Sequence, residues 1–253
     1  VYLWGYNGYY PVAMVKGGDW DRVKDKADTS GLNDGDFLQI RKKLVSFRLK
    51  CRDVPNIFIN TYEYKPLIGL DYIRDQSKRI FDYEYDGLGR LCRTFVRNGT
   101  THKKELLSSY SYCYGSSVGS NRIQTRDYLS ADATSFKETN TYHDLLGRPI
   151  ETVLTAASPA GKDIVLLNGY DDFGRPYSEY RPVPMTTSTG AYSSFSAVHP
   201  EILKFYNWEV YAFSKTLYDD SPLDRPVEEY GPGSPWHTRG KSVRTTYLVN
   251  DDS

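Results

Sequence analysis

Residues 81–91 read Phe81-Asp82-Tyr83-Glu84-Tyr85-Asp86-Gly87-Leu88-Gly89-Arg90-Leu91, and this stretch decides the fold class. Its first half alternates aromatic side chains with carboxylates, and only a β-strand sorts alternate residues onto two faces. Asp86 can accept a hydrogen bond from the backbone two residues further on, and Gly89 can adopt a positive φ. Arg90 begins the next strand close enough to pair with Asp86. The stretch therefore predicts a β-hairpin with its aromatic rings on the packed face.

The same core recurs three more times along the chain, with variations. The copies read Tyr142-His143-Asp144-Leu145-Leu146-Gly147-Arg148, Tyr170-Asp171-Asp172-Phe173-Gly174-Arg175 and Tyr218-Asp219-Asp220-Ser221-Pro222-Leu223-Asp224-Arg225. The expected turn-motif residues are Tyr85, Asp86, Gly89, Arg90, Tyr142, Gly147, Arg148, Tyr170, Asp171, Gly174, Arg175, Tyr218, Asp219 and Arg225. In the second copy, His143 is expected to replace the turn aspartate. Repeats of this kind imply stacked hairpins.

Alternating patterns elsewhere predict further strands at residues 58–64, 91–96, 110–114, 150–154 and 243–249. Three stretches favour helices instead. Residues 19–26 have an acidic start and later lysines, and residues 37–44 place apolar side chains at helical spacing. A third helix is expected within residues 198–206, beginning no earlier than Pro200.

These patterns together predict a mainly β fold. We expect an antiparallel hairpin ribbon with a small helical insertion near the N-terminus. Residues 1–56 would form an N-terminal strand plus the helical hairpin insertion, and residues 57–253 would form the repeat sheet.

Composition narrows the functional classes. The 253 residues include 32 basic and 32 acidic side chains, and this balance argues against a nucleic-acid binder, which normally shows a basic patch. No apolar run is long enough for a transmembrane helix, and no signal peptide is visible. The 23 tyrosines favour half-buried pleated surfaces. The three cysteines form no CxxC pair; free thiols are favoured, with one bridge left open.

The chain carries no complete sequence signature of catalysis. The chain has no HExxH, Gly-x-Ser-x-Gly or phosphate-binding loop motif. Asp82, Glu84 and Asp86 have a spacing that paired glycosidase carboxylates tolerate. Their recurrence in turns and on solvated strand faces explains them better. His237 beside Trp236 is expected to be surface packing. We therefore expect no catalytic residue, no cofactor and no metal site.

Aromatic stacking is the better candidate for binding. Sugar rings dock on exposed Trp and Tyr faces because the C–H face of a sugar is apolar. The candidate ligand-binding residues are Trp4, Tyr6, Trp208 and Trp236. Each of them can also be explained as a core residue.

The four cores resemble the YD repeats of the Rhs (rearrangement hotspot) family, which teneurins and insecticidal toxin-complex proteins share. Three further segments resemble Bacteroidetes-type Rhs-repeat proteins. These are Leu3-Trp4-Gly5-Tyr6-Asn7-Gly8-Tyr9-Tyr10-Pro11-Val12-Ala13, Thr61-Tyr62-Glu63-Tyr64-Lys65-Pro66-Leu67-Ile68-Gly69, and the stretch from Ala212 to Gly233. The spacing between cores is uneven, and the chain has no Asp-Pro dipeptide. The self-cleaving aspartyl motif of toxin-bearing members is therefore missing.

The resemblance implies an extracellular or cell-surface location and a non-enzymatic scaffold, either a fragment or part of a toxin carrier. An alternative is a carbohydrate- or protein-binding module that uses exposed Tyr and Trp, with a glycan or a cell-surface protein as the partner. A glycoside hydrolase is the third and weakest reading. The five or so repeat units are too few to close on themselves, so we also expect weak self-association and no nucleic-acid partner.

Overall fold

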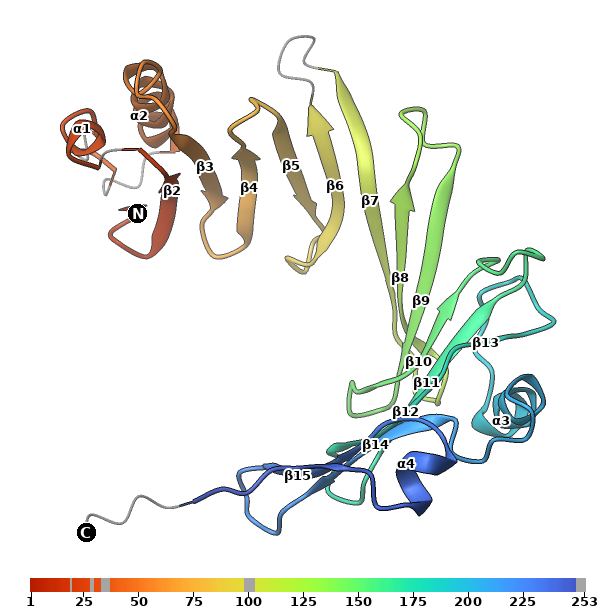
Figure 1. Ribbon diagram of the computed structural model, residues 1–253. Coiled ribbons are helices and arrows are strands. Elements are labelled where there is room, and N and C mark those ends of the chain that lie inside the picture. The colour runs from red at the N-terminus through yellow and green to blue at the C-terminus, as the bar shows by residue number, and fades with distance from the viewer. Residues whose placement is uncertain (19, 28–29, 33–36, 98–102, 249–253) are drawn as a thin grey trace, which may run out of the picture. The chain divides into compact units, whose positions relative to one another are not determined.

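The computed structural model describes residues 1–18, 20–27, 30–32, 37–97 and 103–248. Its strands form a 16-stranded antiparallel sheet in which neighbours in the sheet are neighbours in the chain, except that β13 lies off the path and pairs with β11 (Figure 1). The path begins at β1 and ends at β16. The predicted mainly β fold of successive antiparallel hairpins is confirmed.

The chain divides into two compact units. Unit 1 comprises residues 1–110 and 127–136, and unit 2 comprises residues 111–126 and 137–253. The boundary crosses three strands: β7 (Lys104–Cys113), β8 (Asn121–Tyr128) and β9 (Phe136–His143). Each unit has its own hydrophobic core.

Unit 1 contains two helices and the first strands of the sheet. They are β1 (Tyr2–Gly5), β2 (Tyr10–Lys16), α1 (Trp20–Lys24), α2 (Phe37–Lys50), β3 (Phe58–Lys65), β4 (Gly69–Arg74), β5 (Ile80–Tyr85) and β6 (Leu91–Arg97). Both helices fall where sequence patterns predicted them, although α2 runs two turns further than residue 44. Between the two helices of the expected helical hairpin, residues 28–29 and 33–36 lie outside the described residues.

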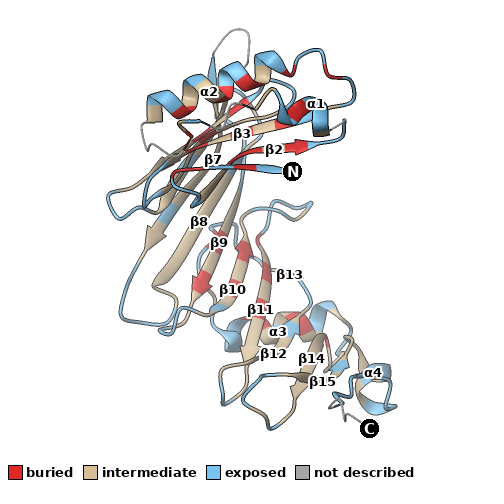
Figure 2. Ribbon diagram, turned by 90° about the vertical axis from the view of Figure 1, so that its left-hand side faces the viewer, coloured by how far each residue is buried: buried red, intermediate tan, exposed pale blue. Residues whose placement is uncertain are grey.

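The core of unit 1 lies between α2 and one face of the sheet. Ile40, Leu44 and Phe47 recur at helical spacing and are buried, and they pack in one cluster with Val12 and Ile59. Figure 2 shows buried positions, in red, along α2 and on β2. Burying one such side chain contributes about 1.5–3 kcal/mol to stability relative to leaving it exposed.

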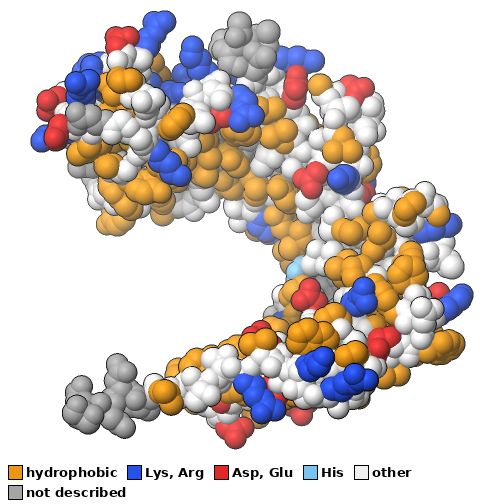
Figure 3. Space-filling view, in the orientation of Figure 1, with side chains coloured by type: hydrophobic (Ala, Val, Ile, Leu, Met, Phe, Trp, Pro, Cys, Tyr) orange, Lys and Arg blue, Asp and Glu red, His pale blue; other side chains and the backbone are white. Residues whose placement is uncertain are grey.

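The expectation that aromatic rings take the packed face is wrong for β5. On β5 it is Ile80 and Asp82 that are buried, whereas Phe81, Tyr83 and Tyr85 are only half-buried. The reason is that α2 covers the opposite face. Alternation fixes which residues share a face but not which face receives the helix. Figure 3 shows hydrophobic side chains gathered on the visible face over β2–β5, with charged side chains around α1 and α2.

Unit 2 contains the remaining elements. They are β10 (Pro149–Leu154), β11 (Ile164–Tyr170), β12 (Pro176–Tyr180), β13 (Val183–Pro184), α3 (Phe195–Phe205), β14 (Phe213–Tyr218), β15 (Pro226–Tyr230), α4 (Ser234–Thr238) and β16 (Val243–Arg244). The strand expected at 243–249 is only two residues long within the described part, and α4 was not predicted.

The start of α3 corrects a second expectation. The helix begins at Phe195 and contains Pro200, so it does not wait for the proline. Val198 and Ile202 are buried in the core of unit 2 beside Val153 and Val165. Pro200 lacks only the one N–H that would donate to the Ser196 carbonyl, and the buried apolar face decides where the helix starts.

Two further facts concern the whole described chain. None of its helices has the length and apolar character that a membrane span requires. Cys51, Cys92 and Cys113 are free thiols, and Cys51 is buried in the core of unit 1.

Candidate functional site

The Asp86–Arg90 turn is built from hydrogen bonds that start and end at Asp86. One carboxylate oxygen, Oδ1, accepts the backbone N–H groups of Leu88 at 2.9 Å and Arg90 at 3.0 Å. The other, Oδ2, accepts Arg90 Nε at 2.8 Å. The Asp86 carbonyl accepts the Gly89 N–H, and Gly89 has a φ of 75°. This is a turn closed by a left-handed glycine, a common way to join two antiparallel strands.

The same bonds recur in two further turns. The carboxylates of Asp144 and Asp171 each accept the backbone N–H two residues on, the backbone N–H of the arginine four residues on, and that arginine's Nε at 2.7 Å. Gly147 and Gly174 have φ values of 80° and 85°. The predicted positive φ at these hairpin glycines is confirmed. The arginine hydrogen bonds hold the pKa of the Asp86 carboxyl below its usual value.

The Asp219–Arg225 turn is closed by the same pairing of aspartate with arginine, although it is two residues longer than the other turns. Asp219 Oδ2 accepts Arg225 Nε at 2.8 Å, while its Oδ1 accepts the Ser221 N–H and hydroxyl. Asp224, with a φ of 49°, stands where the other turns have glycine. Asp tolerates the left-handed region better than most side chains, which is why this looser copy still closes.

Several tyrosines also bond their own segment to the strand that precedes it in the sheet. The hydroxyl of Tyr170 donates to the Pro149 carbonyl, and that of Tyr218 donates to the Pro176 carbonyl, both at 2.8 Å. Tyr247 donates to the Pro226 carbonyl at 3.1 Å. In unit 1, Tyr64 and Tyr85 donate in the same way to Pro11 and Leu70. The acceptor is always the carbonyl at or near the start of the neighbouring strand.

The turn arginine completes this link. Arg148 lies over the ring of Tyr170 at 4.5 Å, and Arg175 lies over the ring of Tyr218 at 4.7 Å. Arg225 lies over the ring of Tyr247 at 4.8 Å. An arginine over an aromatic ring contributes about 0.5–1 kcal/mol at exposed sites. In unit 2 the motif therefore joins one repeat to the next as well as closing its own turn.

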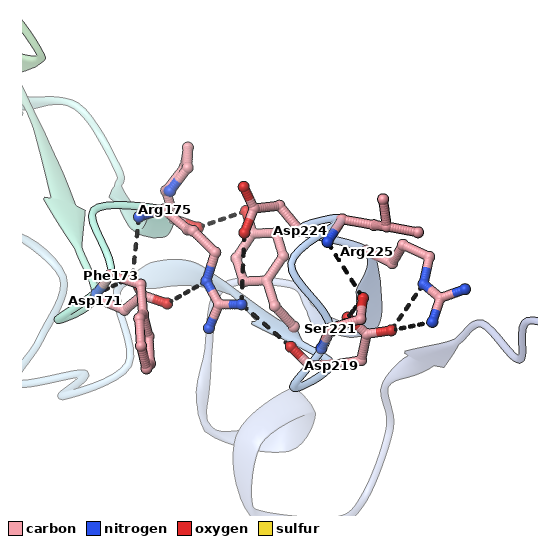
Figure 4. A network of polar contacts seen from close by, with 10 residues as sticks. Asp171, Phe173, Arg175, Asp219, Ser221, Asp224 and Arg225 are labelled. Carbon is pink, nitrogen blue, oxygen red and sulfur yellow. Dashed lines mark hydrogen bonds and ion pairs between the residues drawn. The ribbon is translucent and has the colours of Figure 1, made fainter.

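The contact between the third and fourth turns shows the link most fully (Figure 4). Arg175 pairs with Asp171 of its own turn, and its Nη1 donates to the Asp219 carbonyl at 3.2 Å. The same nitrogen lies 3.7 Å from Asp224. One guanidinium thus bridges two turns.

Sequence reasoning misplaced one member of the motif. Asp144, not His143, makes the turn-closing bonds, so His143 takes the position that Tyr85, Tyr170 and Tyr218 hold in the other copies. Tyr142 points to the other face, is buried in the core of unit 2, and donates its hydroxyl to the Gly190 carbonyl at 2.8 Å. In the first three copies the bonds follow the Asp-to-Arg spacing of four residues, and the pairing of aspartate with arginine is what all four copies share.

Two turns of the same design were missed. Asp75 accepts the backbone N–H of Arg79 at 2.9 Å and its Nε at 2.8 Å, with Lys78 at a φ of 64° in the glycine position. Ser158 accepts the Lys162 N–H at 2.8 Å, and Gly161 has a φ of 66°. Neither has the preceding tyrosine. The signal that finds the first is Asp followed by Arg four residues later.

A buried carboxylate holds the segment before α3 against the sheet. Asp163 accepts hydrogen bonds from the N–H groups of Ala156, Thr189 and Gly190 and from the Thr187 hydroxyl, at 2.9–3.0 Å. Burial raises the pKa of Asp163, but these four bonds outweigh it and lower the pKa below its usual value.

Glu151 lies close by on β10 and is fully buried. Its Oε1 accepts the Ser193 N–H at 3.0 Å, and its Oε2 has no hydrogen-bond partner among the described residues. Burial raises the pKa of Glu151 to about 7, and the Ser193 bond offsets only part of that rise. Neither Glu151 nor Asp163 was singled out from sequence, because burial of an acidic residue has no signature in the chain.

The four aromatic ligand candidates fall into different settings. Tyr6 is buried in unit 1, edge-on to Tyr10 and Tyr64, while Trp4 is exposed. In unit 2, Trp208 is 73% exposed and Trp236 is also exposed. Glu209 accepts hydrogen bonds from the N–H and hydroxyl of Ser234, which ties the segment carrying Trp208 to the start of α4.

The carboxylates considered for glycoside hydrolysis are each engaged by a cation. Asp82 pairs with Arg97, Glu84 pairs with Lys104 at 2.8 Å, and Asp86 pairs with Arg90. His237 stacks on Tyr211 and Tyr230 with ring centroids 4.5 and 5.3 Å apart. Within the described residues, no three His, Cys, Asp or Glu side chains are grouped so as to hold a metal ion.

Comparison with known proteins gives one family model and a set of solved structures, three of which are described below. A family model described as "Domain of unknown function (DUF6443)" matches residues 116–249. The comparison with curated proteins gives no match.

The solved structures are distant in sequence. The crystal structure of TcdB2-TccC3 aligns over 68% of this chain at 13% identity and a TM-score of 0.45. TcdB2-TccC3-Cdc42 aligns over 72% at 16% identity and a TM-score of 0.40. TcdB2-TccC3 without its hypervariable C-terminal region aligns over 90% at 16% identity and a TM-score of 0.42. The aligned part makes up only 7–10% of those chains.

Proposed function

This chain belongs to the DUF6443 family, and from that premise we propose that it is a non-enzymatic Rhs-like, YD-repeat structural scaffold of a cell-surface or secreted protein. The observation that carries the proposal is the bonding between successive hairpins. Each turn in unit 2 uses its arginine twice, once for its own aspartate and once for the next tyrosine. Residues that serve the continuity of a sheet are what a scaffold requires.

The polar groups of the motif support the absence of catalysis in this proposal. The turn carboxylates are occupied by backbone N–H groups and by arginine, and each of these bonds closes a turn. A general acid or base needs a pKa near the working pH, whereas the pKa of Asp86, Asp144, Asp171 and Asp219 is lowered.

A binding module is the second candidate, favoured by the exposed tryptophans of unit 2. Trp208 presents most of its ring to solvent, and Glu209 fixes its segment to the start of α4, near Trp236 in the chain. Exposed aromatic rings held on a fixed backbone suit a glycan or a protein partner.

A double-mutant cycle tests the scaffold. We expect Arg175→Ala and Tyr218→Leu to couple by about 0.5–1 kcal/mol in the free energy of unfolding by urea. The matched control pairs Arg175→Ala with Tyr247→Leu and should show no coupling, because Tyr247 lies under Arg225. Absence of coupling between Arg175 and Tyr218 would contradict the proposal.

The same preparations distinguish the rivals. We expect no hydrolysis of glycoside, ester or peptide substrates, and a turnover lost on substituting one Asp or Glu would show an enzyme instead. A glycan that changes tryptophan fluorescence in the parent but not in Trp208→Ala would favour the binding module.

A further inference from the structure

A pocket of about 780 Å³ lies between the C-terminal half of α2 and the strands β3–β5 of unit 1. Its size falls within the range of about 300–1,000 Å³ that small-molecule sites occupy. The turn after α2 and the Asp75–Arg79 turn complete its wall. The pocket has no role in linking successive hairpins, so the scaffold function does not account for it.

One part of the wall of this pocket is apolar and partly open to solvent. Leu49 is 64% exposed and Phe58 is 50% exposed, and Val45 beside them is exposed as well. Ile59 and Ile80, which also line it, are buried. Exposed aliphatic and aromatic side chains grouped around one concavity mark a binding surface more often than scattered ones do.

The charged groups of the pocket are all of one sign. Arg48, Arg52, Arg74 and Lys78 line it, and no Asp or Glu is among the lining residues. This is notable in a chain with equal numbers of acidic and basic residues. The nearest carboxylate in the Asp75–Arg79 turn, that of Asp75, is taken by Arg79 at 2.8 Å. Among the described residues, none of the four cations forms an ion pair.

Arg48 shows that the positive charge is built into the wall. Its Nη1 donates to the carbonyls of Ile59 at 2.6 Å and Arg74 at 3.2 Å, and its Nη2 donates to the Asp75 carbonyl at 2.7 Å. Burial, followed by repulsion from Arg74, lowers the pKa of Arg48. Carbonyl oxygens fix the guanidinium in place but do not neutralise it, so the site favours an anion.

We propose that this pocket binds a single-chain amphiphile with an anionic headgroup, of the long-chain carboxylate type. The hydrocarbon chain lies against Val45, Leu49 and Phe58, and the carboxylate lies among Arg52, Arg74 and Lys78. A peptide fits less well, because β3 is paired on both sides and β4 likewise, so no strand edge is free for backbone pairing. A flat bilayer fits less well, because the apolar groups line a concavity.

Titration calorimetry of the full chain with dodecanoate tests the proposal. We expect saturable binding of one dodecanoate, and no comparable binding of acetate, which lacks the chain, or of dodecyltrimethylammonium, which has the opposite charge. Arg52→Glu should weaken dodecanoate binding about tenfold or more, because it replaces attraction by repulsion. The matched control Lys50→Glu makes the same charge change on α2 outside this pocket and should change the affinity less than twofold.

A second variant keeps the test independent of charge. Leu49→Ser removes an exposed apolar wall and should also weaken binding, with the circular dichroism spectrum unchanged. The proposal is overturned if dodecanoate does not bind, if Lys50→Glu weakens binding as much as Arg52→Glu, or if dodecyltrimethylammonium binds equally well. Binding to phosphatidylglycerol vesicles or to a short acidic peptide in place of dodecanoate would also overturn it, in favour of those partners.

Discussion

At the scale of single residues, the strongest contrast is between two buried carboxylates of unit 2. Asp163 accepts four hydrogen bonds, whereas Glu151 accepts one and leaves Oε2 without a partner in the described part of the chain. The pKa of Asp163 is lowered and that of Glu151 is raised. The two groups therefore make the stability of unit 2 depend on pH in opposite directions.

The raised pKa of Glu151 predicts a loss of stability toward neutral pH. In the unfolded chain this carboxyl ionises near its ordinary value of 4.5, but in the folded chain it holds its proton until about pH 7. Between these values the unfolded state binds fewer protons, so stability falls as pH rises, by up to about 3 kcal/mol. Glu151→Gln should remove this fall and stabilise the protein at pH 8.

Urea denaturation of the parent and of Glu151→Gln at pH 5 and pH 8 measures the effect. The side-chain oxygen of the Gln variant can still accept the Ser193 N–H, so the substitution removes the titrating group and keeps this hydrogen bond. Asp163→Asn is the comparison. The lowered pKa of Asp163 means that its contribution is present above pH 3.8 and is lost as pH falls through its folded value, so this variant should destabilise at both test pH values. An unchanged pH dependence in Glu151→Gln would show that Glu151 ionises freely in the fold.

At the scale of the element, the hairpin turn offers an internal control. Gly87 and Gly89 lie in the same turn, and a Cβ on either would meet no atom within 4 Å. Only Gly89 has a positive φ, of 75°. Gly89→Val should therefore destabilise by more than about 1 kcal/mol through backbone strain alone, and Gly87→Val should cost clearly less. Equal losses in the free energy of unfolding would mean that the positive φ of Gly89 is not the reason why this position requires glycine.

The elements also show how far the sequence could predict the structure. The Asp-to-Arg spacing and the positive-φ glycines are local, so the turns were predictable from residues 86–90 alone. The start of α3 and the buried face of β5 depend on what packs against them, and local patterns do not contain that information. For the same reason, the sequence could not predict which of the four ligand candidates, Trp4, Tyr6, Trp208 and Trp236, would be buried and which exposed.

At the scale of the whole molecule, the sheet path has two ends. β1 begins it and β16 ends it, and β16 is a two-residue strand paired with β15 through Glu228 and Glu229. An edge strand offers unpaired backbone groups to another chain. We therefore predict weak self-association, seen as a rise in mean mass by light scattering across a concentration series.

Arg244→Pro provides the matched variant. Thr245 donates its N–H to the Val227 carbonyl of β15, so the N–H of Arg244, one residue earlier, points to the free edge of β16, and proline removes that donor. It should lower the apparent mass at high concentration if that edge is used. A strict monomer at every concentration would contradict the prediction. Association that Arg244→Pro leaves unchanged would place the contact elsewhere.

The tyrosine and arginine contacts between hairpins have a direction. Each of the tyrosines that link neighbouring hairpins, Tyr170, Tyr218 and Tyr247 in unit 2, donates to a carbonyl earlier in the chain, and the arginine that lies over each ring also precedes its tyrosine. A ribosome releases the chain in this same order, and folding can begin at the N-terminal side during synthesis. When each of these tyrosines of unit 2 leaves the ribosome, the carbonyl that accepts its hydroxyl and the arginine that lies over its ring have already been synthesised. The fold is suited to vectorial assembly, in which no hairpin has to wait for a later one to receive its tyrosine.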